Sequence, residues 1–132
     1  MRLMFDTHAV LWWLQGGGGL SPAQVQLLEK ADATGEAVGL SIISFWEIAK
    51  LVEHGRIDLG GSIDVVFDEI EESASIAVLP LTPRITLEST RLGPAFHRDP
   101  ADQLIAATSR VLGLRLITSD ERIRRSGAVA VV

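Results

Sequence analysis

The stretch that decides the fold is residues 1–14, MRLMFDTHAVLWWL. It contains a short apolar run at residues 2–5, which is typical of a buried strand, and Asp6 follows that run directly. The remainder of the stretch predicts a first helix. A buried strand that leads at once into a helix is the repeating unit of α/β proteins.

The rest of the chain continues this alternation. Further apolar runs of strand length lie at residues 38–41, 76–79, 115–118 and 128–131. Helical patterns lie between the strands at residues 22–33, 45–54, 63–74, 83–92 and 100–112. Three of these helices begin with a capping residue followed by proline, at Ser21, Thr82 and Asp99. The alternation predicts an α/β sandwich with a mainly parallel sheet.

The composition restricts the class of protein. A chain of 132 residues matches one globular domain, which we expect to span residues 1–132. The absence of cysteine excludes disulfides, thiolate zinc sites and a cysteine nucleophile. No segment approaches the roughly 20 apolar residues that cross a bilayer, so a soluble, cytoplasmic protein is expected. The four-glycine run at residues 16–19 predicts a flexible connection, since no Gly-Lys-Ser/Thr motif follows it.

Four isolated acids stand where predicted elements meet: Asp6, Glu47, Asp102 and Asp120. Asp6 and Asp120 follow strands, Glu47 follows a strand after a short turn, and Asp102 lies in the first turn of a helix. In open α/β sheets, ligands bind outside the carboxyl ends of parallel strands. Carboxylates that arrive at this edge from distant parts of the chain can therefore converge.

Each acid also has a purely structural interpretation, because acids are common at helix starts. Ser44 and Glu47 have the spacing of a capping box, and Asp99 immediately precedes a proline. Asp6 and Asp120 can cap helices as well. The four acids together are harder to explain by capping than any one of them alone.

If these carboxylates meet, their repulsion has to be relieved by protons, cationic side chains or bound metal. Only Lys50 and Arg2 are basic residues close in sequence to Asp6 or Glu47. Oxygen ligands favour Mg²⁺ or Mn²⁺, whereas the three histidines lack the short spacing of a zinc site. A carboxylate-held Mg²⁺ activates water and stabilises charge in phosphoryl transfer, so phosphodiester hydrolysis is the leading chemistry.

Four blocks carry a resemblance to a known family: MFDTHAVLWWL at residues 4–14, SIISFWEIAKL at 41–51, HRDPADQLIAAT at 97–108 and LITSDERI at 116–123. Together they resemble the PIN domain and, more narrowly, the toxin subunits of VapBC-type toxin-antitoxin systems. The resemblance implies a three-layer α/β/α sandwich with a sheet of about five strands. It also implies Mg²⁺-dependent cleavage of RNA, with Mn²⁺ as a substitute, homodimerisation, and inhibition by a cognate antitoxin protein.

The resemblance also implies roles for the acids. Asp6, Glu47 and Asp102 would hold the metal, and Asp120 would bind a second ion or orient water. Asp99 lies close to the third acid of the family pattern, but we assign it to capping because Pro100 follows it.

Several neighbours of the acids are candidates for secondary roles. The hydroxyls of Thr7 and Ser119 can hold a water or a phosphate, although a local backbone bond explains either residue equally well. His97 and Arg98 can contact phosphate, but an exposed basic pair is usually only solvated surface. His8 is expected on the surface of the first helix, or partly buried there.

Two aromatic pairs are the obvious apolar anchors: Trp12 with Trp13, and Phe45 with Trp46. Adjacent helical residues point about 100° apart, so both rings of a pair cannot fill the same space. We expect one ring of each pair in the core and the other in a dimer contact or an antitoxin groove.

Other functions compete with this interpretation. A haloacid-dehalogenase type of phosphotransferase needs a second aspartate two residues after the first, where this chain has His8. A receiver domain needs a paired-acid start and a lysine on its last strand, and both are missing. A catalytically silent PIN-like interaction module is the main alternative, and metal binding distinguishes it. Two-metal carboxylate sites also cut DNA, so RNA as the substrate follows from the resemblance alone.

Overall fold

The computed structural model describes residues 1–132 and contains one four-stranded parallel sheet with strand order β3-β2-β1-β4. The strands are β1 (Leu3–Phe5), β2 (Val38–Ser41), β3 (Ile76–Leu79) and β4 (Arg115–Ile117). All three pairings are parallel. The chain builds outward from β1 to β2 and β3, then returns to place β4 on the other side of β1. The order therefore reverses at β1, where open α/β sheets form their binding crevice.

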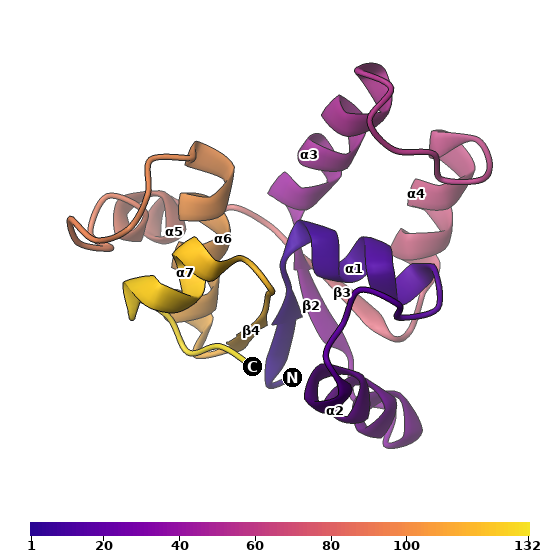
Figure 1. Cartoon of the computed structure of the whole chain (residues 1–132), viewed down its shortest axis with the longest axis horizontal. Coiled ribbons are helices and arrows are strands. Elements are labelled where there is room, and N and C mark those ends of the chain that lie inside the picture. Colours follow the sequence, from indigo (N-terminus) through magenta and orange to yellow (C-terminus); the bar gives the residue numbers. More distant parts are fainter.

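Helices cover both faces of this sheet (Figure 1). One layer contains α1 (Thr7–Leu14), α2 (Pro22–Ala33), α3 (Ile42–Glu53) and α4 (Ile63–Glu72). The opposite layer contains α5 (Pro83–Glu88), α6 (Pro100–Leu112) and α7 (Glu121–Ser126). The predicted three-layer α/β/α sandwich is confirmed. None of the helices combines the length and the apolar character needed to cross a membrane.

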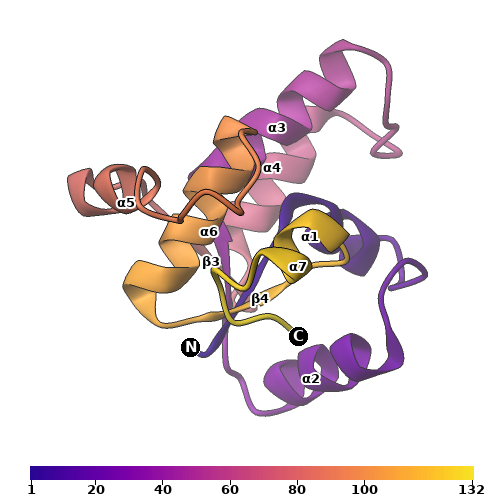
Figure 2. The same cartoon turned by 60° about the vertical axis from the view of Figure 1, so that its left-hand side comes forward.

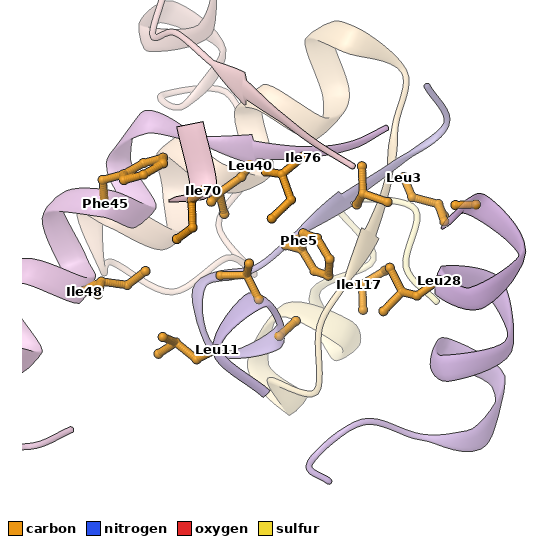
Figure 3. Close-up of a cluster of buried hydrophobic side chains, with 14 residues drawn as sticks. Leu3, Phe5, Leu11, Leu28, Leu40, Phe45, Ile48, Ile70, Ile76 and Ile117 are labelled. Carbon is orange, nitrogen blue, oxygen red and sulfur yellow. The ribbon is translucent and has the colours of Figure 1, made fainter. Parts of the chain in front are cut away.

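The alternating strand residues explain the two layers. Phe5 and Ile117 point into a cluster shared with α1 to α4 (Figure 3), whereas Met4 and Leu116 point into a second cluster shared with α6 and α7. Successive strand residues face opposite sides of a sheet, so a buried run such as Leu3–Phe5 supplies both cores. The two cores fix the strand ends between the helical layers.

The predicted fifth strand at residues 128–131 is wrong as a strand. Only Val131 forms a bridge, parallel to Leu116, and hydrogen bonds of 2.8 and 3.0 Å join Leu116 to Ala130 and Val132. Gly127 ends α7 in the left-handed conformation with φ +67°, and few residues after it run beside β4. The chain therefore touches the edge of the sheet without forming another strand.

Helix α3 begins earlier than the predicted residue 45. Ser41, the last residue of β2, accepts a hydrogen bond from the Ile43 amide and caps the helix at Ile42. Ser44 is buried inside the helix, so the capping box predicted for Ser44 and Glu47 does not form. The strand runs directly into the helix, which places the second turn of α3 over the end of the sheet.

Two other predicted helix limits also differ from the structure, and one helix is additional to the prediction. Helices α4 and α5 end before their predicted limits at residues 74 and 92, and α7 was not predicted as a helix. Helices α3 and α6 come from opposite layers yet lie side by side (Figure 2). This contact brings residues of α3 close to the start of α6.

Candidate metal centre at the strand ends

A pocket of about 320 Å³ lies at the carboxyl ends of β1 and β4. It is lined by Asp6, His8, Trp12, Glu47, Asp99, Asp102, Ser119, Asp120 and Arg122. All four acids singled out in the sequence are in this lining, although they are separated by up to 114 residues (120 minus 6). The structure therefore brings the four carboxylates together.

Asp6 is the most deeply buried of the four, with 7% of its surface exposed. Its Oδ1 accepts a hydrogen bond of 3.1 Å from the His8 amide, so the residue caps α1. Its Oδ2 accepts a hydrogen bond from the hydroxyl of Thr118, which is fully buried at the end of β4. The capping interpretation of Asp6 is confirmed, and the cap itself lies in the pocket.

Glu47 reaches the pocket from the second turn of α3. Its Oε1 accepts a hydrogen bond from the Thr7 hydroxyl, and Thr7 shares a second hydrogen bond of 2.9 Å with the Ser44 hydroxyl. Thr7 and Ser44 are both buried. Thr7 thus has a structural task in orienting Glu47, rather than standing free to hold a water or phosphate.

Asp102 lies in the first turn of α6, and a hydrogen bond of 2.6 Å joins its Oδ2 to His97 Nε2. The His97 ring stacks on Phe96 with centroids 4.8 Å apart and is largely buried. The interpretation of His97 as exposed, solvated surface is therefore wrong. The apolar contact with Phe96 holds the ring against the carboxylate instead.

Asp99 caps α6, as predicted, by accepting a hydrogen bond of 3.0 Å from the Asp102 amide. The same residue also lines the pocket. Capping and participation in the acidic cluster are thus combined in one side chain. The sequence interpretation treated them as alternatives.

Asp120 caps α7 and pairs with Arg122, whose Nη2 lies 3.0 Å from Asp120 Oδ2 and 3.7 Å from Asp102 Oδ2. Partial burial acts to raise the pKa of Asp120, but the hydrogen bonds and charge of Arg122 outweigh it and lower the pKa overall. Asp120 is therefore the acid of the group that keeps its charge most readily.

The other three acids behave in the opposite way. Burial raises the pKa of Asp6, and hydrogen bonds from Thr118 and His8 only partly oppose it. Burial, helped by the charges of Asp102 and Asp6, raises the pKa of Glu47 to about 7. Burial and the charge of Asp99 likewise raise the pKa of Asp102, against the hydrogen bond from His97. In the absence of a cation, the pocket disfavours the ionised form of three carboxyl groups.

Donor atoms around the pocket form two groups that are close enough to share a cation, and neither group includes Asp6. Ligand atoms of Glu47, Asp99 and Asp102 lie within 4.8 Å of one another, as do those of His97, Asp102 and Asp120. Asp102 belongs to both groups. Carboxylate oxygens are the preferred ligands of hard divalent cations, so the donor set fits such an ion and the raised pKa values indicate the charge that it would neutralise.

Some site residues did not emerge from the sequence, and others lie elsewhere. Thr118 and Arg122 were missed, although both contact acids of the pocket. Ser119 lines the pocket as an exposed residue, whereas Arg98 is exposed and lies outside the lining. His8 is exposed at the rim, in agreement with a position on the surface of the first helix.

The two aromatic pairs differ in how deeply their rings are buried. Phe45 is buried and Trp46 is 54% exposed, which confirms the prediction for that pair. Neither Trp12 nor Trp13 is fully buried, so the prediction of one ring in the core is wrong for that pair. Trp13 packs against the edge of the core, and Trp12 is the only hydrophobic residue lining the acidic pocket.

The glycine run explains the position of Trp12. A Cβ added at Gly19 would lie 2.3 Å from the Trp12 indole, so only glycine allows the loop to pass over the ring.

Comparison with known proteins agrees with this geometry. A family model described as the PIN domain matches residues 3–128. The chain is 33% identical over 122 residues to Ribonuclease VapC22 of Mycobacterium tuberculosis, a match that covers 92% of this chain and 89% of that protein.

Solved structures share the fold at low sequence identity. A chain of VapBC2 from Rickettsia felis, bound to a DNA fragment from its promoter, aligns with a TM-score of 0.71 and 14% identity, covering 100% of this chain and 98% of that chain. A chain of DNA-bound VapBC from Salmonella typhimurium aligns with a TM-score of 0.70 and 16% identity, covering 100% and 97%. The strand order, the acidic pocket, the family match and the identity to a curated ribonuclease lead to one conclusion: the chain belongs to the PIN domain family.

Proposed function

We propose that this protein is a metal-dependent endoribonuclease of the VapC type, which hydrolyses RNA phosphodiester bonds with Mg²⁺ or, in its place, Mn²⁺. The observation that carries the proposal is the convergence of Asp6, Glu47, Asp102 and Asp120 in one pocket where the strand order reverses. The identity to a protein named as a ribonuclease supports the choice of reaction.

In this proposal Asp6, Glu47 and Asp102 hold the metal, and Asp120 holds a second ion or orients water. A divalent ion bound there would lower the pKa of a water and stabilise the charge that develops in phosphoryl transfer. Thr118 and Thr7 fix the orientation of Asp6 and Glu47, so these carboxylates present their oxygens without searching several rotamers.

Arg122 provides the positive charge of the pocket. Its side chain is 60% exposed and bridges Asp120 and Asp102 from the solvent side. An arginine in this position can leave its carboxylate partners and bind phosphate oxygens in a bidentate manner when a polyanion approaches. We assign to it the binding of a phosphate near the scissile bond.

We extend the toxin-antitoxin assignment to the partners. The solved relatives include VapBC from two organisms and FitAB bound to a DNA fragment. By analogy, a cognate antitoxin protein covers this chain, which acts as a cytoplasmic, single-domain homodimer.

The test is cleavage of a panel of single-stranded and structured RNAs, with single-stranded DNA of the same sequences alongside. Mg²⁺ or Mn²⁺ is compared with EDTA, and Asp6→Asn and Asp102→Asn are compared with Asp68→Asn, which changes an exposed acid on α4. We expect metal-dependent RNA cleavage that both pocket variants lose and the α4 variant retains.

Failure to cut any RNA, by folded and antitoxin-free protein, contradicts the nuclease. Titration with Mn²⁺ followed by electron paramagnetic resonance then separates the alternatives. A silent interaction module need not bind the ion, whereas an intact site binds it and loses it in Asp6→Asn. Cleavage of DNA in preference to RNA would change the substrate class.

A further inference from the structure

A second hollow lies beside the acidic pocket and shares two of its residues, His8 and Glu47. Its volume is about 180 Å³, and it is lined by His8, Trp46, Glu47, Lys50, Leu51, His54 and Arg56. The roles proposed above for the acidic pocket use none of its residues beyond Glu47. Because Glu47 lines both depressions, whatever occupies the second one lies next to an acid of the first.

Helix α3 forms one wall of this hollow. Trp46, Lys50 and His54 follow one another at intervals of four residues, which places them on one side of the helix. Eight residues at about 1.5 Å per residue extend over about 12 Å. This length accommodates about three stacked nucleotides at about 3.4 Å each. The row leads away from Glu47 toward Arg56.

Trp46 presents an aromatic surface without an obvious structural purpose. It is 54% exposed, whereas its neighbour Phe45 is buried and packs in the core. The Lys50 ammonium lies 6.0 Å from the centre of the Trp46 ring, at the limit of a cation–π contact. An aromatic side chain on which a base can stack, beside a positive charge, is the combination by which proteins hold single-stranded nucleic acid.

The charges of the hollow differ from those of the whole chain. The formal net charge of the protein is -5, yet Lys50 and Arg56 line the hollow beside a single acid, Glu47. Glu53 pairs with Lys50 at 3.4 Å and with His54 at 3.5 Å but does not line the hollow. Arg56 makes no ion pair within 4.0 Å, so its charge is available to a polyanion.

We propose that this hollow is a substrate subsite, which holds the single-stranded RNA segment next to the scissile phosphodiester. One base stacks on Trp46, and the adjoining phosphates lie near Lys50 and Arg56. The inference rests on the proposed nuclease function and adds the side chains that hold its substrate beside the acidic pocket. Stacking requires an unpaired base, and a duplex keeps its bases inside the helix.

The test measures affinity separately from cleavage. A fluorescently labelled single-stranded RNA of mixed sequence is titrated with full-length protein carrying Asp102→Asn, and binding is followed by anisotropy. We expect Trp46→Leu to weaken binding about 5- to 100-fold and Trp46→Phe to weaken it much less. Lys50→Ala and Arg56→Ala should each make the slope of log affinity against log salt shallower by about 0.7. Lys30→Ala is the matched control, since Lys30 lies in a depression beside Arg2 and Arg115, at the other end of the strands.

The same substitutions without Asp102→Asn give the kinetic test. Trp46→Leu should raise KM for single-stranded RNA and leave kcat nearly unchanged, because the ring lies outside the acidic pocket.

The possible failures are distinguishable. Unchanged affinity and KM in the Trp46 and Lys50 variants, in protein that still cuts RNA, overturn the subsite and leave the nuclease intact. Equal losses on duplex RNA overturn the assignment of base stacking to Trp46. A shift of Trp46→Leu from dimer to monomer in sedimentation, with RNA affinity retained, identifies the hollow as a protein interface and overturns the proposal. Binding that responds as expected in a protein that never cuts RNA refutes the nuclease alone.

Discussion

Replacing Glu47 by glutamine should stabilise the metal-free protein near neutral pH and weaken its response to metal. The carboxyl group of Glu47 has a pKa raised from 4.5 to about 7, chiefly by burial. The folded state therefore holds a proton that the unfolded state releases more easily. For a raised pKa, folding stability is highest below about pH 4.5 and is lost as the pH rises to about 7.

The magnitude follows from that shift. A change in pKa from 4.5 to about 7 corresponds to about 3 kcal/mol, at about 1.4 kcal/mol per pH unit. Glu47 is only half-buried, and screening by water reduces the effect to about 1 to 2 kcal/mol. For 132 residues the entropy of unfolding is about 0.28 kcal/mol/K, so Glu47→Gln should raise Tm by about 4 to 7 °C at pH 8 in EDTA. Glutamine keeps the oxygen that accepts from Thr7.

The assay is thermal unfolding followed by circular dichroism between pH 4.5 and 8.5, with Asp68→Asn as the control. The advantage of the glutamine variant should shrink toward zero at pH 4.5, where both side chains are neutral. Saturating Mg²⁺ should make the wild-type protein the more stable of the two, because only the wild-type residue offers a charged ligand. A variant that is no more stable than wild type at pH 8 in EDTA would refute the reasoning, as would a difference that does not depend on pH.

Three further outcomes test other parts of the structure. Thr118→Val should reduce cleavage and metal affinity by about 10- to 100-fold with little change in fold, because Asp6 loses the donor that orients it, whereas Thr118→Ser should retain most of both. Gly19→Ala should lower the free energy of unfolding by about 1 to 3 kcal/mol in urea titrations, because its Cβ meets Trp12; Gly18→Ala, which faces open space, should leave that energy nearly unchanged. Adding Mg²⁺ at about 100 times its Kd should stabilise the wild-type protein by about 2.7 kcal/mol at pH 8. A midpoint of thermal unfolding that does not change when the ion is added would argue against the metal site.

Much of the fold followed from short-range patterns. Val38–Ser41 and Ile76–Leu79 were predicted with their observed limits, because a buried parallel strand is a compact apolar run with few alternatives. The run at residues 128–131 looks the same in sequence but lacks a second neighbouring strand and a full set of ladder partners. Local composition cannot distinguish a strand from a segment that touches the sheet at one residue.

In the candidate site too, local patterns predicted some residues, whereas others depend on contacts between distant parts of the chain. The rule that ligands bind at strand ends was enough to select Asp6 and Asp120, because Asp6 follows β1 directly and Asp120 comes soon after β4. Thr118 escaped notice because a β-branched residue at the end of a strand needs no functional explanation. The position of His97 depends on Phe96 and on the start of α6, contacts that no spacing in the sequence reveals.

Three acids of the pocket are also helix caps, which affects how the proposed nuclease could lose its activity. Asp6, Asp99 and Asp120 each cap the N-terminus of a helix and also line the pocket. Asparagine caps a helix about as well as aspartate but carries no charge. A single change of aspartate to asparagine at one of these positions would thus leave the helices in place while depriving the pocket of a ligand. In the proposed nuclease, one substitution would therefore be enough to remove activity while the domain still folds.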